Sequence, residues 1–310
     1  MRLTRRATLA ALSLPAVARA QSFPSRPLRL IVPFAAGGGA DASARMLAEP
    51  LGAALGQPVV VENRPGGGAT VGALAVARAA PDGHTLLYGT PGPQIINPHL
   101  MRSLPYDPVR DFAPVTALKR APNLLCVHPS VPARDVAELI ALARARPGQL
   151  TFASSGIGAS SHLAGEMLKH LARIDITHVP YRGTGPALTD LMAGTVTMAL
   201  DTYSVLMPPA RNGALRALAV TTPQRSALAS ELPALAETLP GFDAAAFNYV
   251  ATTAGVPAPI VARLNTAIVD ILNDPTFRAR MEAQGEEPLP SSPEELAATF
   301  GGEWKPDPWG

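Results

Sequence analysis

The fold is decided by one stretch near the start of the chain, Leu28-Arg-Leu-Ile-Val-Pro-Phe-Ala-Ala-Gly-Gly-Gly-Ala-Asp41. An apolar run ends at Pro33-Phe34, three glycines follow, and a helical pattern extends from Ala42 to Leu55. The order is that of a strand, a glycine loop and a helix start. Because such a loop exposes backbone N–H groups and the helix dipole adds partial positive charge, the stretch predicts a site for a small anion.

Apolar runs and helical patterns alternate along the rest of the chain. The predicted strands are Leu28–Pro33, Pro58–Glu62, Thr85–Gly89, Leu124–His128, Leu150–Ala153, Thr177–Val179, Val196–Leu200 and Leu215–Thr221. The predicted helices are Ala42–Leu55, Thr70–Ala79, Val136–Arg146, Ser161–Ala172, Pro186–Met192, Tyr203–Asn212, Ala258–Asn273 and Thr276–Gln284. This alternation predicts an α/β fold with mostly parallel sheets flanked by helices, in which ligands bind beyond the carboxyl ends of strands.

Four loops rich in glycine or hydroxyl residues fall at such strand ends. They are residues 37–39, 90–93, 154–161 and 201–204. Two of them lie in the N-terminal half and two in the middle, which predicts two lobes that face each other across a cleft. We place the first lobe at residues 21–120 and 224–310 and the second at residues 121–223, with the first crossing within 116–123.

Residues 1–20 have the pattern of a secretory signal peptide. Arg2, Arg5 and Arg6 precede an apolar run, and Ala18-Arg19-Ala20 is a small-x-small cleavage site. The Arg pair leaves both the general secretory and the twin-arginine routes open. Removal of these residues takes away four arginines and no acid, so 22 basic residues remain against 24 acidic ones. That balance argues against a nucleic-acid surface, and the signal peptide itself predicts a location outside the cytoplasm.

The chain has 310 residues, of which 47% are hydrophobic, and a single cysteine. This composition is enough for a sizeable core without an internal disulfide. Cys126 lies in an apolar run, so we expect it to be a small buried residue of a strand and not a nucleophile.

The loop from Ser154 to His162 has the same arrangement as the first stretch, because it follows a strand and begins a helix. Its hydroxyl groups could donate to a carboxylate, or Ser160 or Ser161 could simply cap the helix. Asp41 is open to two interpretations as well. It could cap its helix or stand in the first turn, which we favour, or it could meet an ammonium group on a ligand.

Catalytic and cofactor motifs are weak in this sequence. The loop Asn63–Thr70 lacks the Lys-[Ser/Thr] of a P-loop, and the first glycine run is not a dinucleotide fingerprint. His162, Glu166 and His170 share a helix face but form no zinc-protease motif. Asp201 could be a general base, yet no nucleophile can be assigned to it. We therefore expect binding without catalysis, and no cofactor or metal.

Several ordered motifs resemble the tripartite tricarboxylate transporter substrate-binding family, the Bug receptors. They include Gly37-Gly-Gly-Ala-Asp41, Leu55-Gly-Gln-Pro-Val-Val-Val-Glu-Asn-Arg-Pro-Gly-Gly-Gly68, Ala80-Pro-Asp-Gly-His-Thr-Leu-Leu87, Leu104-Pro-Tyr-Asp-Pro108, Ser161-His-Leu-Ala-Gly-Glu166 and His178-Val-Pro-Tyr-Arg-Gly183. The resemblance spans about residues 23–295. It implies a two-lobed periplasmic binding protein, type II-like, that captures a small organic acid and delivers it to membrane permease subunits.

The resemblance also implies which residues hold the ligand. In the first lobe they are Phe34, Ala36, Gly38, Asp41 and Thr90. In the second lobe they are Ser154, Ser155, Ser160, Ser161, His162, Tyr181, Gly183 and Asp201. Two departures from the family pattern bear on the pocket: Thr90-Pro-Gly-Pro93 removes backbone donors, and Tyr203 follows Thr202 where smaller residues are frequent. A third, the glycine- and proline-rich end from Phe300 to Gly310, predicts reduced cover of the first lobe.

The sequence therefore predicts a periplasmic, monomeric receptor for a carboxylate-bearing small molecule, with membrane permease subunits as partners and no contact with nucleic acid. Two alternatives stay open. One is a sensor that reports its ligand to a membrane signalling partner. The other is a secreted hydrolase or lyase of similar fold that uses Asp201 or His162.

Overall fold

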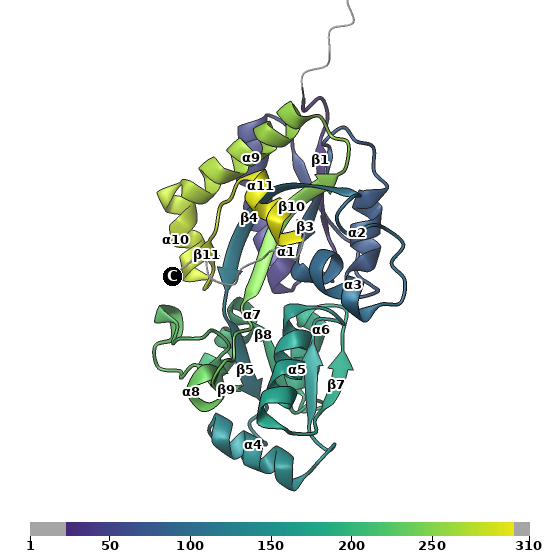
Figure 1. The fold of residues 1–310 in the computed structure, drawn as a ribbon. Coiled ribbons are helices and arrows are strands. Elements are labelled where there is room, and N and C mark those ends of the chain that lie inside the picture. Colours follow the sequence, from purple (N-terminus) through teal and green to yellow (C-terminus); the bar gives the residue numbers. More distant parts are fainter. Residues whose placement is uncertain (1–22, 301–310) are drawn as a thin grey trace, which may run out of the picture.

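The chain forms two lobes, which lie one above the other in Figure 1. The structure is a computed structural model that describes residues 23–300. The signal peptide expected at residues 1–20 and the last ten residues lie outside this range. Each lobe has one sheet with helices on both faces, so the predicted two-lobed α/β fold is confirmed.

The first lobe is built on a six-stranded sheet with the order β11-β4-β10-β3-β1-β2. Its strands are β1 (Leu28–Val32), β2 (Val59–Asn63), β3 (Thr85–Gly89), β4 (Phe112–Ala121), β10 (Ala246–Thr253) and β11 (Glu287–Pro288). Its helices are α1 (Gly39–Leu55), α2 (Thr70–Ala77), α3 (Asn97–Leu100), α9 (Ala258–Asn273), α10 (Pro275–Ala283) and α11 (Pro293–Ala298). A single π-helical turn, Gly92–Ile96, precedes α3.

Successive residues of β1 supply two different cores, because side chains alternate across a strand. Leu30 packs in the cluster that includes residues of α1, α9 and α10, whereas Ile31 packs against α2. Both side chains are fully buried. The sheet is therefore covered on both faces, and only the ends of its strands remain for a site.

The second lobe has a five-stranded sheet with the order β7-β6-β8-β5-β9. Its strands are β5 (Asn123–Val127), β6 (Thr151–Ser154), β7 (Thr177–Pro180), β8 (Met198–Thr202) and β9 (Arg216–Val220). Its helices are α4 (Val136–Ala145), α5 (Ser160–Ala172), α6 (Thr184–Met192), α7 (Tyr203–Arg211) and α8 (Leu235–Thr238), with a 3₁₀ turn at Ala227–Ala229. Cys126 is buried in one of its cores, as expected, and burial raises the pKa of its thiol to about 12.

Both sheets are mixed, whereas the sequence led us to expect mostly parallel ones. β10 is antiparallel to both of its neighbours in the first lobe, and β5 is antiparallel to both of its neighbours in the second. These strands adjoin the passages between the lobes. β4 ends at Ala121 and β5 begins at Asn123, so a single stretch of extended chain leaves one sheet and enters the other without a crossover helix.

The return passage lies later than the predicted boundary at residue 224. Leu235 and Phe242 pack in the core of the second lobe, and Val220 forms a parallel bridge with Ala234. The chain then reaches β10 at Ala246. These contacts favour a second lobe that extends to about residue 244, because the segment after β9 covers that lobe's sheet. Among the helices of residues 23–300, none is long and apolar enough to span a bilayer.

Candidate ligand-binding site

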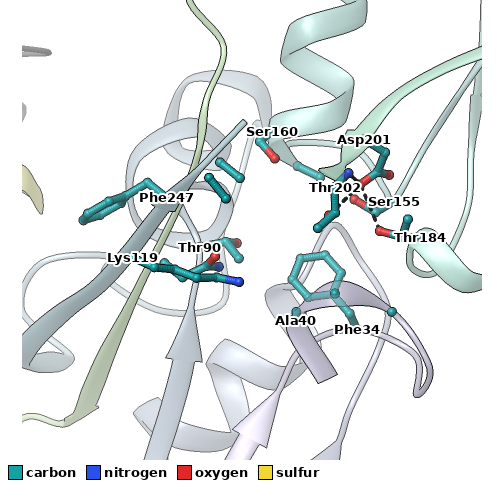
Figure 2. Close-up of a pocket in the computed structure, with 16 residues that line it drawn as sticks. Phe34, Ala40, Thr90, Lys119, Ser155, Ser160, Thr184, Asp201, Thr202 and Phe247 are labelled. Carbon is teal, nitrogen blue, oxygen red and sulfur yellow. Dashed lines mark hydrogen bonds between the residues drawn. The ribbon is translucent and has the colours of Figure 1, made fainter. Parts of the chain in front are cut away.

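A cleft lies between the lobes and encloses about 580 Å³, part of it open to solvent. The lobes also touch beside it, since the Ala35 N–H donates to the Arg182 carbonyl at 2.8 Å. The cleft is lined by the loops after β1, β3 and β6 and by the end of β8 (Figure 2). These are the carboxyl ends of strands where the sequence predicted a site.

Four helices begin at the wall of this cleft. Gly39 opens α1, Ser160 opens α5, Thr184 opens α6, and Thr202 precedes α7. None of these four N-termini is capped by a side chain within the described chain. Away from the cleft, Asp135, Asp274 and Ser292 cap α4, α10 and α11, whereas α2 and α9 also lack a side-chain cap. The cleft is distinguished by the number of helices that begin at its wall. Their N-termini leave backbone N–H groups without an intrahelical partner and concentrate partial positive charge there, although the Tyr203 N–H of α7 donates to the Pro122 carbonyl at 3.3 Å.

The glycine loop of the first lobe is held by Asp41. Its carboxylate accepts hydrogen bonds from the Gly37 N–H at 3.0 Å, from Asn63 at 2.9 Å and from Arg45 at 3.1 Å. Burial alone would raise the pKa of Asp41, but these bonds outweigh it and the pKa is lowered. Asp41 is a first-turn acid, as we favoured, although the N-cap residue is Gly38. It does not line the cleft.

Asp201 organises the wall of the second lobe. Its Oδ1 accepts from the Thr184 hydroxyl at 2.9 Å and from the Thr202 N–H and hydroxyl at 2.7 and 3.0 Å (Figure 2). Its Oδ2 is buried and has no hydrogen-bond partner among the described residues. Burial raises the pKa of Asp201, and the bonds from Thr202 and Thr184 oppose that rise.

Ser161 fixes the loop that carries Ser155. The Ser155 N–H donates to Ser161 Oγ at 2.9 Å, and the two hydroxyl oxygens lie 2.8 Å apart. Ser161 is fully buried, whereas Ser155 and Ser160 line the cleft. The alternative interpretation, that Ser160 or Ser161 caps α5, is not met, because the N-cap position belongs to Ala159.

The structure brings together part of the predicted set. Six predicted residues line the cleft: Phe34, Gly38, Thr90, Ser155, Ser160 and Asp201. Seven do not: Ala36, Asp41, Ser154, Ser161, His162, Tyr181 and Gly183. Ala36 and Gly183 instead flank the contact between the lobes, where a Cβ on Gly183 would lie 3.2 Å from the Ala35 nitrogen.

The other predicted residues that do not line the cleft lie under the second-lobe loop and form contacts within that lobe. Ser154 is buried, and its hydroxyl lies 2.6 Å from His178 Nε2. His178 stacks on His162 at 4.3 Å, and His162 Nδ1 accepts from the Gly158 N–H. Burial and the neighbouring His162 lower the pKa of His178 to about 4. Tyr181 donates to Asp190 at 2.6 Å.

Sequence reasoning missed ten lining residues. They are Gly39, Ala40, Lys119, Ala121, Ala159, Thr184, Thr202, Ala246, Phe247 and Asn248. Thr184 and Thr202 adjoin predicted residues, so the signal was a hydroxyl group at the first turn of a helix. Lys119 stands in residues 116–123, the segment that was predicted as the first crossing. Arg120 follows it there, so no local signal marked Lys119 as a lining residue.

The positions of the side chains give little support to a catalytic reaction in the cleft. The buried Ser154–His178 pair does not line the cleft, so a bound molecule would not reach the serine. His162 is held by Gly158 and His178 outside the lining. No group of three or more His, Cys, Asp or Glu residues that could hold a metal occurs within residues 23–300. The site offers hydrogen-bond donors and an enclosing cleft.

Two α/β lobes around a cleft that is lined by helix N-termini have the architecture of a solute-binding receptor of the periplasmic type. Comparison with known proteins identifies the family. The model of the tripartite tricarboxylate transporter family receptor, TctC, matches residues 43–301. BugT of Bordetella pertussis is 35% identical over 289 residues, which cover 93% of this chain and 89% of that protein. The chain belongs to this family, whose members are solute-binding receptors that work with membrane subunits of a transporter.

Solved structures agree with this assignment. The Rhodopseudomonas palustris protein Rpa4515 with adipate is 38% identical, with a TM-score of 0.88 over 91% of this chain and 94% of that one. MatC from the same organism with bound malate is 35% identical, with a TM-score of 0.86 and coverages of 91% and 97%. The periplasmic binding protein BugD is 34% identical, with a TM-score of 0.86 and coverages of 91% and 95%.

Proposed function

We propose that this chain is a periplasmic receptor that captures a small carboxylate in its cleft and passes it to the membrane subunits of a tripartite tricarboxylate-type transporter. The observation that carries the proposal is the convergence of four uncapped helix N-termini, those of α1, α5, α6 and α7, on one cleft. Such termini favour anions. The relatives with adipate and malate support the same class of ligand.

The proposed binding set follows from the lining. Gly38 and Gly39 offer backbone N–H groups, and Ser155 and Ser160 add hydroxyl groups to the same cavity. A hydrogen bond to a charged group contributes roughly 1.5–3 kcal/mol. The predicted residues behind the lining, such as Ser161 and His162, would act by holding these donors in place.

The ligand would leave unchanged, because the cleft presents no nucleophile paired with a base among the residues described. We also propose a monomer in solution and a periplasmic location that follows cleavage of residues 1–20. Incubation with a ligand and recovery of that ligand intact would support the absence of turnover. Loss of uptake in a deletion strain would favour transport, whereas loss of a transcriptional response with normal uptake would favour a sensor.

A thermal-shift screen tests the proposal directly. The mature protein is heated with organic acids and with their amide or ester analogues. A ligand that binds only the native state raises the unfolding midpoint by mass action. We expect a shift with an acid and none with its neutral analogue. A folded protein, free of co-purified ligand by mass spectrometry, that responds to no acid would contradict the proposal.

The hydroxyl set is tested with one substitution and one control. We expect Ser155→Ala to weaken binding of the acid found in the screen about tenfold, because it removes a donor to a charged group. Ser130→Ala is the control, since Ser130 is exposed and pairs with His128 away from the cleft. Equal affinities of the two variants would remove the Ser155 loop from the site.

A further inference from the structure

Lys119 is a buried cation at the wall of the cleft. It lies on β4, its side chain is 3% exposed, and it lines the cavity. Its ammonium donates to Ser43 Oγ at 2.6 Å and forms an ion pair with Glu286, whose side chain is 1% exposed. Ser43 in turn donates to the same carboxylate oxygen of Glu286 at 2.5 Å. These three residues therefore form one polar cluster that is shielded from water. The Tyr88 hydroxyl lies beside it, and neither that group nor Glu286 Oε2 has a hydrogen-bond partner among the described residues.

The cluster fixes where the ammonium points. Ser43 lies on α1, whose first turn carries the glycine loop, and Glu286 immediately precedes β11, which pairs with β4. Two partners use two of the three N–H donors of a lysine ammonium. Figure 2 shows the nitrogen of Lys119 reaching into the cavity beside Thr90. One donor of the ammonium is thus not used by these two partners, and the nitrogen is already held at the cavity wall before a ligand binds.

Thr90 provides a second unsatisfied group on this wall. Its hydroxyl is buried and has no hydrogen-bond partner within residues 23–300. Buried polar atoms are nearly always hydrogen-bonded, so an orphan hydroxyl in a cavity wall points to a partner that enters the cavity. Lys119 and Thr90 lie on the opposite side of the cavity from Thr184 and Asp201, with the Phe34 ring between the two pairs (Figure 2). The cleft therefore has two polar ends.

We propose that Lys119 and Thr90 form a subsite for a second carboxylate, so that this receptor selects dicarboxylates over monocarboxylates. The inference rests on the proposed function, in which the helix N-termini bind the first carboxylate. Glu286 and Ser43 hold the ammonium in place, so little rotamer freedom is lost when the ligand binds. A monocarboxylate or a monoamide would leave the Lys119 donor without an anionic partner, and selectivity follows from that difference.

The test measures two affinities by calorimetry, for straight-chain dicarboxylates from succinate to adipate and for their monoamides. For the length that fits, we expect the wild-type protein to bind the dicarboxylate at least about tenfold more tightly than its monoamide. In Lys119→Met/Glu286→Leu, which removes both charges of the pair, we expect the two affinities to become equal. Removing both partners avoids the unpaired buried carboxylate that Lys119→Met alone would leave.

Thr90→Val serves as the second variant, because it removes the unsatisfied hydroxyl of the subsite and leaves the Lys119–Glu286 pair intact. We expect it to reduce the preference for the dicarboxylate, since the distal carboxylate loses one donor. Thermal unfolding establishes that each variant is folded, and if the double variant does not fold, Thr90→Val decides alone. A preference that persists in the double variant, or that is unchanged in Thr90→Val, overturns the inference while leaving carboxylate binding intact. Failure of the wild-type protein to bind any acid or monoamide contradicts the proposed function instead.

Discussion

The two walls of the cleft meet a ligand in different ways. In the first lobe, the loop after β1 presents backbone at Gly38 and Gly39, and Asp41 fixes that loop from behind. The facing part of the second lobe presents side chains, and Asp201 fixes the hydroxyls of Thr184 and Thr202. The glycine loop therefore depends on the absence of a Cβ, whereas the facing wall depends on which side-chain atoms are present. Substitutions should affect the two walls by different routes.

The largest effect is expected at Gly39, where the two walls approach each other. A Cβ there would lie 2.5 Å from Thr202 Cγ2, whereas a Cβ on Gly38 would find its nearest neighbour, the Thr184 nitrogen, at 3.6 Å. We expect Gly39→Ala to weaken ligand binding about ten- to hundredfold by obstructing closure of the lobes. Stability without ligand should change little, because an open cleft relieves the clash. Calorimetric titration and urea unfolding measure the two quantities.

Two further variants separate this clash from a general disturbance of the loop. Gly38→Ala is the matched control, and we expect it to bind nearly as the wild-type protein does. Gly39→Ala/Thr202→Ser removes the methyl group that the new Cβ would strike, so it should recover much of the affinity. If Gly38→Ala were as damaging as Gly39→Ala, or if the double variant gave no recovery, the proposed closure contact would be wrong.

The second effect concerns the side-chain wall. Thr184→Val removes the hydroxyl that donates to Asp201 Oδ1 and leaves a buried carboxylate with one partner fewer. We expect the free energy of unfolding in urea to fall by about 1–3 kcal/mol, the usual cost of an unsatisfied buried polar group. Thr189→Val on the same helix is the control, since Thr189 is exposed. Equal stabilities would show that Asp201 does not depend on Thr184.

Local patterns predicted much of the fold. The apolar runs and glycine loops placed most elements within a few residues, and the predicted helix Ala258–Asn273 agrees with α9 residue for residue. β10 was missed although five of its eight residues are aromatic or β-branched, a composition that favours a strand. Pairing with β3 and β4, which are distant in sequence, makes it a strand. Its orientation, and hence the mixed sheet, could not follow from a local pattern.

Residues of the site could be predicted where they belong to a short sequence pattern. Gly38 and Ser155 stand in loops between a strand and a helix, which the sequence displays directly. Lys119 was not predictable as a buried residue, because its partner Glu286 lies 167 positions away. Tyr181 and His162 failed as lining residues for a related reason. Their side chains are taken up by Asp190 and by Gly158 and His178, contacts that only the folded lobe reveals.

The smallest expected effect is on the pH dependence of stability, and it differs between the residues that hold the two walls in place. The pKa of His178 is lowered from 6.5 to about 4 in the folded protein, first by burial and then by His162, while Glu166 opposes the change. As pH falls from 6.5 toward 4, the unfolded chain binds a proton that the folded chain does not, so stability decreases. The pKa of Asp41 is lowered below its usual 3.8, so this group stays ionised in both states above pH 5.

Thermal unfolding between pH 7 and pH 5 compares these two groups. We expect His178→Phe to reduce the loss of the unfolding midpoint on acidification, because the ring still stacks on Phe152 but no longer titrates. Ser154 keeps its bond from the Gly156 N–H in that variant. Asp41→Asn should lower the midpoint by a similar amount at both pH values, since it removes hydrogen bonds without changing proton uptake in this range. Equal pH slopes in the wild-type protein and His178→Phe would mean that the second-lobe loop carries no pH sensitivity. The two walls would then differ in geometry alone.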